Sequence, residues 1–440
     1  MQPTRVPATM RAVPVDDTVM DLAVERLTFG PDALARREGQ IVFVPLAAPG
    51  DDVRARITKR ERGYLRAELL DVVRAGPDRI APPCPAFGRC GGCQWQHVAL
   101  PAQRRAKEAI VAEQLARLGG LRDVDVRPIV AAPDGFAHRA RVTLVAEGRR
   151  LGYQRARSHV LEEVAGCPIA RPAVERHFDV ARRLVERLRT APTRVTIAEA
   201  PGGVVLVVAL AAAPSPPDVA AAETLLAAHA TVRGAVLAHG TDRVIVGDPT
   251  VRVELEPGLA IEAPADVFAQ VNPAANRLLV ETVLRLGDFA AGAAVLDLYC
   301  GAGNFALPLA RRGVRVHGVE RDPLAVDAAG ANAARLGLDA RFTAATVADA
   351  LARERDPVDG VVLDPPRAGA ADAIDALVAR GPRRIVYVSC DPATLGRDLA
   401  PFFERGYELV AVETVELFPQ TSHVETIAVL ASRTARKGAS

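Results

Sequence analysis

The residue of this 440-residue chain that is best placed for chemistry is a single cysteine, Cys390. It follows the apolar run Arg384 to Ser389 and precedes Asp391-Pro392. A run of this kind closed by proline predicts a buried strand of a parallel sheet. Ligands of open α/β sheets bind just outside the carboxyl ends of the strands. A thiol there can act as a nucleophile if its pKa is lowered, although a lone cysteine is more often a small buried apolar residue.

Three further cysteines, spaced as C-x5-C-x2-C, form a cluster at Cys84, Cys90 and Cys93. The Gly and Pro residues around them permit the backbone bends by which several thiolates converge on one ion. Cys167, which like Cys84 is followed by Pro, is the candidate for the fourth ligand. Four thiolates can hold an iron–sulfur cluster or zinc, and the spacing alone does not separate the two. The sequence therefore predicts a four-cysteine metal site.

A second chemical motif starts at the strand-like run Ala294 to Leu298, which leads through Tyr299-Cys300-Gly301-Ala302-Gly303 into a predicted helix. Gly-x-Gly between a strand and a helix lets the backbone approach a nucleotide-like ligand. Glu320 ends the next strand, where a carboxylate accepts hydrogen bonds from ribose hydroxyls. This pattern alone fits NAD as well as S-adenosylmethionine. The next strand ends in Asp364-Pro365-Pro366-Arg367, which is uncommon in dehydrogenases and typical of methyltransferases. We assign Cys300 to packing.

The elements that position these residues indicate a multidomain protein. Short runs separated by Pro and Gly predict a small OB/TRAM-like β-barrel. A central α+β domain carries the cysteines, and alternating β and α runs then predict a Rossmann-like α/β domain. We expect the helix at 100–118 to be able to pack on this last domain. The expected boundaries are a disordered tail at 1–13, the barrel at 14–76, the central domain at 77–262, the α/β domain at 263–433 and a tail at 434–440.

The front of the chain is basic, which predicts a polyanionic partner. Cations surround Tyr64 on one edge of the barrel, and a second basic block contains Tyr153; such surfaces suit nucleic acid. The two groups are Arg54, Arg56, Lys59, Arg60, Arg62 and Arg66, and Arg139, Arg141, Arg149, Arg150, Arg155 and Arg157. We expect a cytoplasmic protein without a membrane span, because no signal peptide or long apolar run is evident.

Together and in this order, the motifs resemble those of the RNA uracil-5-methyltransferases of the iron–sulfur, TRAM-domain type. The resemblance covers nearly the full length and includes Ser389-Cys390-Asp391-Pro392 and His423-Val424-Glu425-Thr426. It implies a class I methyltransferase fold, with Cys390 as nucleophile and Glu425 as general base. It implies a [4Fe–4S] cluster on Cys84, Cys90, Cys93 and Cys167. It implies S-adenosylmethionine contacts at Gln270, Tyr299, Gly301, Asn304, Glu320 and Asp364. The adenine contact is open between Thr346 and Asp349.

The implied chemistry explains the residue types. Uracil C5 is a weak nucleophile, and addition of a thiolate to C6 turns it into an enolate that can take a methyl group. A carboxylate then removes the C5 proton, and the thiolate is eliminated. The uracil must leave its stack to reach Cys390, and Asp364 and Gln270 are placed to read its polar edge. Without this context, Glu425 would be read as an exposed strand carboxylate.

The substrate is expected to be RNA, and the resemblance favours 23S ribosomal RNA, with transfer RNA as the alternative. We expect a monomer without an obligate protein partner, and a cluster with a structural role. A hypothesis of another class is an iron–sulfur RNA-binding or redox-responsive protein without methyl transfer, against which the Cys390–Glu425 pair argues. A third hypothesis targets cytosine C5, but those enzymes usually have Pro before the cysteine, where this chain has Ser389.

Overall fold

A computed structural model describes residues 18–132, 134–353 and 356–433. The tails expected at 1–13 and 434–440 lie outside the described residues. The chain divides into two compact units, of which the first contains residues up to 81 together with 97–102. The second contains residues 82–96 and the chain from 103 onward.

The first unit is a closed five-stranded barrel with the strand order β1-β2-β3-β5-β4. Its strands are β1 (Val19–Leu27), β2 (Asp32–Arg37), β3 (Gln40–Pro45), β4 (Asp52–Glu61) and β5 (Tyr64–Arg74). Met20, Leu22 and Val24 of β1 are buried while the residues between them are exposed, as the two-residue period of a strand requires. The buried Asp51 carboxylate accepts hydrogen bonds from Arg79 and from the Gly76 N–H. The predicted small β-barrel is confirmed.

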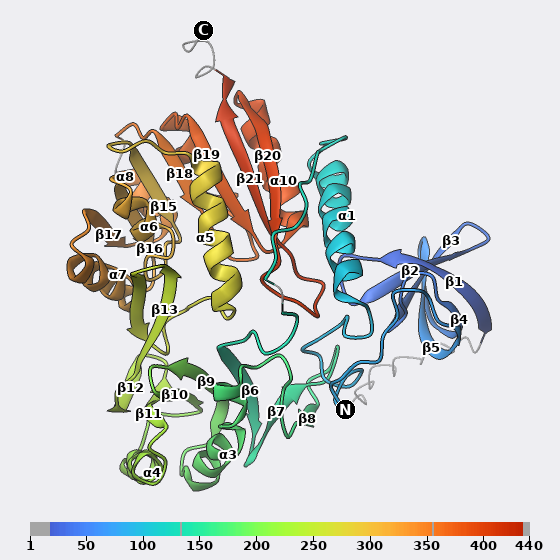
Figure 1. Ribbon diagram of the computed structural model, residues 1–440, viewed down its shortest axis with the longest axis horizontal. Coiled ribbons are helices and arrows are strands. Elements are labelled where there is room, and N and C mark those ends of the chain that lie inside the picture. Colours follow the sequence, from blue (N-terminus) through green and yellow to red (C-terminus); the bar gives the residue numbers. More distant parts are fainter. Residues whose placement is uncertain (1–17, 133, 354–355, 434–440) are drawn as a thin grey trace, which may run out of the picture. The chain divides into compact units, whose positions relative to one another are not determined.

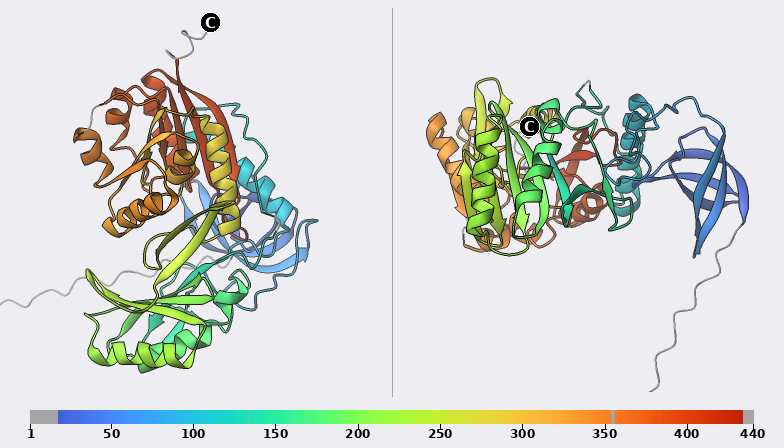
Figure 2. Two further views of the ribbon diagram at one scale, coloured as in Figure 1. Left: turned by 60° about the vertical axis from the view of Figure 1, so that its left-hand side comes forward. Right: turned by 90° about the horizontal axis from the view of Figure 1, so that it is seen from below.

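The second unit contains a central seven-stranded sheet with the order β12-β11-β10-β9-β6-β7-β8. Its strands are β6 (Arg141–Glu147), β7 (Arg150–Gln154), β8 (Leu161–Glu163), β9 (Pro192–Ala200), β10 (Gly203–Leu210), β11 (Val232–His239) and β12 (Asp242–Gly247). Its helices are α2 (Pro172–Glu175), α3 (Phe178–Arg187) and α4 (Pro216–Ala228). Figures 1 and 2 show α3 and α4 beside each other against this sheet, with which they share one apolar core.

A two-stranded ribbon, β13 (Thr250–Glu256) and β14 (Leu259–Pro264), leads into a second seven-stranded sheet. Its strand order is β17-β16-β15-β18-β19-β21-β20, parallel except for β21, which is antiparallel to both neighbours. The strands are β15 (Ala294–Leu298), β16 (Arg315–Glu320), β17 (Ala340–Ala344), β18 (Gly360–Leu363), β19 (Arg384–Ser389), β20 (Tyr407–Val415) and β21 (Glu425–Ser432). The predicted Rossmann-like sheet is confirmed, and the order reverses between β15 and β18, where ligands of such sheets bind.

Helices cover both faces of this sheet, as parallel strands require. Val362 and Val386 face the core formed with α5 to α7, whereas Leu363 and Tyr387 face the opposite core. Adjacent residues of one strand thus belong to different cores, which explains the continuous apolar runs in the sequence. Figure 1 shows α5 lying across β19 and β21. The helices are α5 (Pro273–Gly287), α6 (Ala306–Arg311), α7 (Pro323–Leu336), α8 (Val347–Arg353), α9 (Ile374–Ala379) and α10 (Pro392–Glu404).

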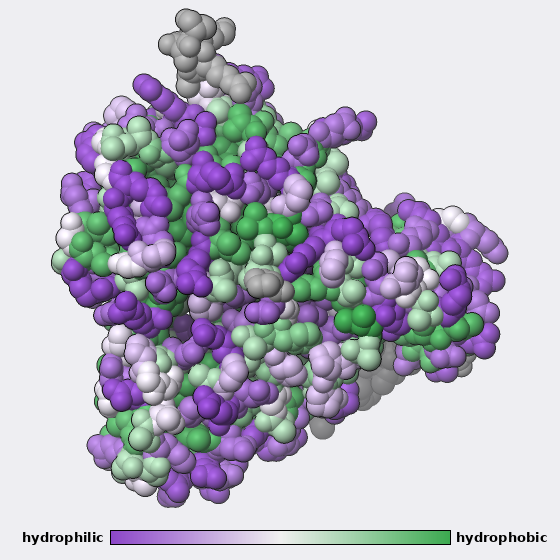
Figure 3. All heavy atoms as spheres, in the orientation of Figure 1, coloured by the Kyte–Doolittle hydropathy of each residue, from purple (hydrophilic) through white to green (hydrophobic). Residues whose placement is uncertain are grey.

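The helix predicted at 100–118 is α1 (Leu100–Leu118). Its buried residues Val111 and Leu115 belong to the same core as Leu363 and Tyr387, so this part of α1 packs against the C-terminal sheet. Among the described residues, no helix is long and apolar enough to cross a membrane. Figure 3 shows hydrophilic side chains interspersed with hydrophobic ones over the face in view.

Candidate active site

The glycine-rich loop lies between β15 and α6, at the carboxyl end of the sheet. Tyr299, Gly301 and Gly303 all have positive φ (64°, 54° and 98°), so the chain turns sharply there. A Cβ placed on Gly303 would lie 2.8 Å from Leu307, whereas one placed on Gly301 would meet nothing within 4 Å. Gly301 therefore presents bare backbone to open space, as contact with a ligand requires.

Glu320, at the end of β16, is held by backbone donors. Its Oε2 accepts from the Gly301 N–H at 3.3 Å, and its Oε1 accepts from the N–H groups of Arg321 and Asp322 at 2.7 and 3.0 Å. The predicted pair Gly301 and Glu320 is thus brought together. A carboxylate fixed in this way can accept from ribose hydroxyls with little loss of side-chain entropy.

Asn304 makes a contact that could not be predicted from the sequence. Its amide exchanges two hydrogen bonds with the amide of Asn276 in α5, at 2.8 and 3.1 Å. Asn276 is fully buried, so α5 fixes the position of Asn304 in the glycine-rich loop. Asn276 lies in a predicted helix with no motif around it, and its partner is 28 residues away. Only the fold reveals this pair.

Two residues next to the loop are buried. Cys300 is 2% exposed and lies close to Gly318, which agrees with its assignment to packing. Asp297, at the carboxyl end of β15, is fully buried, and both carboxyl oxygens lack a hydrogen-bond partner of normal geometry. Burial raises the pKa of Asp297 well above its usual range, and the nearby Ala306 N–H opposes this. Beyond β17, the Thr346 hydroxyl donates to Asp349 at 2.8 Å, so these two candidates for the adenine contact bind each other.

Cys390 directly follows β19 and precedes α10, so the sheet places its thiol at the carboxyl edge. Asp391 caps α10 by accepting from the N–H groups of Ala393 and Thr394, which fixes the turn. Burial, and after it the charge of Glu425, raise the pKa of the Cys390 thiol to about 11, although Arg367 opposes the rise. The thiol is therefore next to a carboxylate and a cation.

Glu425 begins β21, the strand that pairs with β19, and it is buried rather than exposed. Burial raises the pKa of Glu425 well above its usual range; Asp364 adds to the rise and Arg367 opposes it. Burial also raises the pKa of Asp364 to about 7. The structure thus brings together three of the predicted residues, Asp364, Cys390 and Glu425.

Arg367 is the residue that the sequence analysis missed. It acts electrostatically on both Cys390 and Glu425, and its guanidinium lies 3.3 Å from Nε2 of His423. Burial, and after it the charge of Arg367, lower the pKa of His423 to about 4. An exposed arginine directly after Asp-Pro-Pro was the signal that could have found it. It supplies the positive charge that a thiolate at Cys390 needs.

The segment 416–424, which leads into Glu425, is held by α1 and by the cysteine segment. The Gln420 O atom accepts from the N–H groups of Gln94 and Trp95, both at 3.0 Å. Lys107, fully buried in α1, donates to Glu416 Oε1 at 3.1 Å and to the Phe418 O atom at 3.0 Å. The base candidate therefore follows a segment anchored from two distant parts of the sequence.

The four predicted metal-ligating cysteines lie in one neighbourhood. Cys84, Cys90 and Cys167 pack against the core of the central sheet, and Cys93 interacts electrostatically with Cys167 and Cys90. Burial raises the pKa of Cys93 to about 12. The Gly92 N–H donates to Cys90 Sγ at 3.4 Å. Within the described ranges, however, no three His, Cys, Asp or Glu side chains are arranged to hold a metal ion.

The predicted RNA surfaces are less positive than the sequence suggests. On the barrel, Arg54 pairs with Asp21 and Lys59 pairs with Glu61. Arg66 lies 5.9 Å from the Phe43 ring and 5.6 Å from the Tyr64 ring, and the two rings meet edge to face. The barrel thus presents a basic aromatic group, whereas exposed carboxylates neutralise part of its charge. In the second block, Arg150 and Arg155 also pair with carboxylates.

The comparisons with known proteins cover most of the chain. Residues 256–433 match the family described as tRNA (uracil-5-)-methyltransferase, and residues 18–70 match the TRAM domain. A 23S rRNA (uracil(1939)-C(5))-methyltransferase of Alkalilimnicola ehrlichii is 37% identical over 93% of this chain and 96% of its own length. A 23S rRNA (uracil(1939)-C(5))-methyltransferase of Azoarcus sp. is 36% identical over 92% of this chain and 98% of its own length. The solved tRNA (uracil-54, C5)-methyltransferase of Pyrococcus abyssi, a complex with S-adenosyl-L-homocysteine, shares the fold with a TM-score of 0.73, at 23% identity over 94% of this chain and 100% of its own.

Proposed function

We propose that this chain, which belongs to the family of RNA uracil-C5 methyltransferases, methylates C5 of one uridine in 23S ribosomal RNA. The enzyme class follows from family membership, and the choice of 23S RNA is carried over from the names of its relatives. The observation that carries the mechanism is that Cys390 lies close enough to Arg367 and Glu425, at the carboxyl edge of the sheet, for their charges to act on its thiol. A nucleophile, its counterion and a base are there within one site.

The glycine-rich loop fits S-adenosylmethionine. Gly301 offers bare backbone next to open space, and Glu320 is fixed beside it. We assign contacts with the cofactor to Gln270, Tyr299, Gly301, Asn304, Glu320 and Asp364. When bound there, S-adenosylmethionine would supply an electrophilic methyl group and would leave as the thioether S-adenosyl-L-homocysteine.

The chain's own residues account for the remaining chemistry. The Cys390 thiolate, stabilised by Arg367, adds to C6 of the uracil, and the electron pair of the C5–C6 double bond moves to C5 as an enolate. C5 takes the methyl group, and ionised Glu425 removes the proton that C5 still carries. Burial makes this carboxylate a stronger base than an exposed one. The C5–C6 double bond then re-forms as the C6–S bond breaks, which releases the thiolate and 5-methyluridine.

The test of this mechanism is a trapping experiment. RNA that contains 5-fluorouracil has no C5 proton to lose, so wild-type enzyme and S-adenosylmethionine should give a stable adduct at Cys390, visible by mass spectrometry. Cys390→Ala should give neither adduct nor 5-methyluridine. The matched control is Cys300→Ala, which removes a buried thiol outside this chemistry and should retain both. An active Cys390→Ala variant would refute the mechanism.

The RNA substrate is tested separately. Purified enzyme should methylate a 23S rRNA fragment that contains the position numbered 1939 in the relatives, and should leave a transfer RNA transcript unmodified. The opposite preference would assign the enzyme to transfer RNA. Binding of RNA with no methyl transfer to either substrate would support the alternative of an iron–sulfur RNA-binding protein.

We also propose that Cys84, Cys90, Cys93 and Cys167 hold a [4Fe–4S] cluster with a structural role. The mutual electrostatic contacts of their thiols and the N–H donor at Cys90 support this, while zinc is the competing occupant. Iron and sulfide analysis with an absorbance spectrum of anaerobically purified protein separates the two metals. Cys84→Ser should lose iron, brown colour and stability, whereas Cys300→Ala should lose none of them. Colourless wild-type protein with stoichiometric zinc would overturn the cluster.

A further inference from the structure

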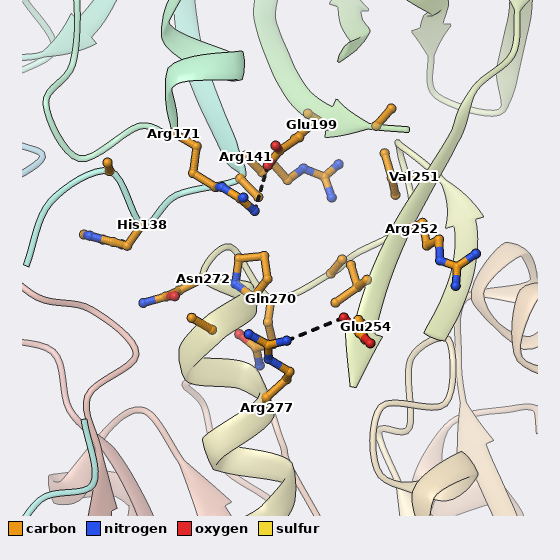
Figure 4. A pocket seen from close by; sticks show the side chains of 18 of the residues that line it. His138, Arg141, Arg171, Glu199, Val251, Arg252, Glu254, Gln270, Asn272 and Arg277 are labelled. Carbon is orange, nitrogen blue, oxygen red and sulfur yellow. Dashed lines mark hydrogen bonds and ion pairs between the residues drawn. The ribbon is translucent and has the colours of Figure 1, made fainter. Parts of the chain in front are cut away.

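The second unit contains a cavity of about 700 Å³, and Gln270 is one of the residues that line it. Figure 4 shows two walls of this cavity. One wall comes from the central sheet and the segment before it, and it carries Arg171 and Glu199. The other wall comes from β13 and the start of α5. The Ala140 N–H donates to the Val271 O atom, and the Glu199 N–H donates to the Ala140 O atom, both at 2.8 Å. The two walls are therefore joined by backbone hydrogen bonds, which makes the cavity a preformed feature.

Gln270, which we propose as a contact of the cofactor, connects this cavity with the proposed function. It lines the cavity, whereas Cys390, Glu425 and Gly301 do not. Two residues further on, Asn272 caps α5 and donates to the Leu417 O atom at 3.1 Å, in the segment that leads to Glu425. A hydrogen bond therefore links the segment that lines the cavity with the segment that leads into Glu425.

Two ion pairs at the cavity can exchange partners. Arg171 lies 2.9 Å from Glu199, and Arg277 lies 3.5 Å from Glu254; Figure 4 shows the pairs on opposite walls. The Arg171 side chain is 42% exposed and the Arg277 side chain is 51% exposed. Exposed pairs of this kind contribute at most about 1 kcal/mol. A phosphate can therefore compete for both guanidinium groups.

Inside the cavity, two polar side chains have capacity to spare. His138 is 7% exposed, and among the described residues its ring interacts with the Gly135 backbone but makes no hydrogen bond of normal geometry. Arg141 donates to the O atoms of Val267 and Ala265 but makes no ion pair among the described residues. A buried imidazole with a ring nitrogen left unpaired is costly unless a ligand satisfies it. A neutral imidazole offers one donor and one acceptor, which suits the edge of a nucleobase.

We propose that this cavity is a subsite for one nucleotide of the substrate RNA next to the target uridine, held by its phosphate at Arg171 and Arg277 and by its base edge at His138. The inference rests on the proposed function, because it takes the ligand to be RNA. The volume lies within the range of about 300–1,000 Å³ that is usual for ligand sites. Sequence-specific recognition of RNA uses unstacked bases of this kind, hydrogen-bonded along their edges.

The test measures binding of the full-length protein to an in vitro transcribed 23S rRNA hairpin that contains the target uridine. Arg171→Ala and Arg277→Ala should each weaken binding about five- to tenfold and lower the salt slope of log Kd by about one. Arg194→Ala is the matched control, because Arg194 is exposed on β9 outside the cavity and should leave the Kd unchanged.

An abasic scan identifies the nucleotide. Each neighbour of the target uridine is replaced in turn by an abasic residue, and the Kd is measured with wild-type protein and with His138→Ala. At one position, the loss of affinity caused by the abasic residue and the loss caused by His138→Ala should not multiply, because each change removes the same contact. Arg277→Ala keeps the test decisive if His138→Ala fails to fold. The subsite would be overturned if the loss from the abasic residue and the loss from His138→Ala multiplied at every position. It would also be overturned if both arginine variants had the wild-type Kd. Methylation of the same hairpin by the wild type would leave the proposed function standing.

Discussion

Gln103 and Gln420, which are 317 residues apart in the sequence, hold each other by two buried hydrogen bonds. The Gln103 amide donates to Gln420 Oε1 at 2.9 Å, and the Gln420 backbone N–H donates to Gln103 Oε1 at 3.0 Å. Gln420 has a φ of 69°, a conformation that a residue other than glycine keeps only when its surroundings enforce it. The pair therefore fixes the segment that leads into Glu425.

Gln103→Leu should lower kcat with little change in the KM for RNA, because the base loses its position while the RNA-binding surfaces stay intact. Loss of these buried hydrogen bonds should also lower the free energy of unfolding by about 2–3 kcal/mol. Fluorescence of Trp95, the chain's single tryptophan, reports on this site. The Trp95 backbone O atom accepts a hydrogen bond from the Gln103 amide at 3.0 Å. Steady-state kinetics and urea unfolding check the two expectations.

The matched control for Gln103 is Gln114→Leu in the same helix. Gln114 is also buried, but its Oε1 atom has no hydrogen-bond partner among the described residues. This variant should retain the wild-type kcat and lose little stability. Equal losses of kcat in the two variants would show that α1 acts only through its general packing.

Lys107→Met should destabilise the protein by about 3 kcal/mol, because it leaves the buried Glu416 carboxylate with Arg104 as its remaining cation. Adding Glu416→Gln should restore part of this loss, since the unpaired charge is then gone. Arg117→Ala, at an exposed position near the end of the same helix, should stay within about 0.5 kcal/mol of the wild type. Urea unfolding of the four proteins measures the differences.

The parts of the fold that could be predicted are those whose signals are local. The runs before Gly301, Asp364 and Cys390 are apolar on both faces and end in turn residues, so each strand end could be read from a few neighbouring residues. By contrast, β2 (Asp32–Arg37) has no β-branched residue. It is a strand because closure of the barrel pairs it with β1 and β3, which its own sequence does not reveal.

The same distinction applies to the site. Cys390 and Asp364 could be predicted to meet because each follows the end of a strand in one sheet, whereas Glu425 was expected there only from the family resemblance. The partners that position the site were not predicted. Asn276 and Gln103 are ordinary helix residues in the sequence, and their roles depend on contacts with chain segments 28 and 317 residues away. Such pairs require the fold.

Arg367→Gln should raise the pKa of Cys390 further above about 11, because the cation that favours the thiolate is lost. Below that pH, the thiolate fraction and the rate of alkylation by iodoacetamide rise about tenfold per pH unit. A shift of one unit would therefore slow alkylation about tenfold at pH 8. Glu425→Gln removes a negative charge and should shift the profile towards lower pH. The alkylation rate of the Cys390 peptide, followed by mass spectrometry from pH 7 to 11, checks both directions.

The conservative variant Arg367→Lys should restore most of the wild-type profile, since it retains the charge. His423→Ala should change the profile less than Arg367→Gln, because its imidazole is neutral above a pKa of about 4. Identical profiles for Arg367→Gln and wild type would remove Arg367 from thiolate stabilisation.

Asn276→Ala should weaken S-adenosylmethionine binding about tenfold, although Asn276 itself is buried in α5 away from solvent. The physical reason is that Asn304, which we propose as a cofactor contact, loses both hydrogen bonds that fix its amide. The control is Asn332→Ala in α7, which breaks an equivalent pair of hydrogen bonds with the Glu262 backbone. Both variants should lose stability by a similar amount, about 1–3 kcal/mol, since each leaves buried polar groups unpaired. Isothermal titration with S-adenosyl-L-homocysteine separates the two roles: equal affinities in the two variants would mean that the Asn276–Asn304 pair serves packing alone.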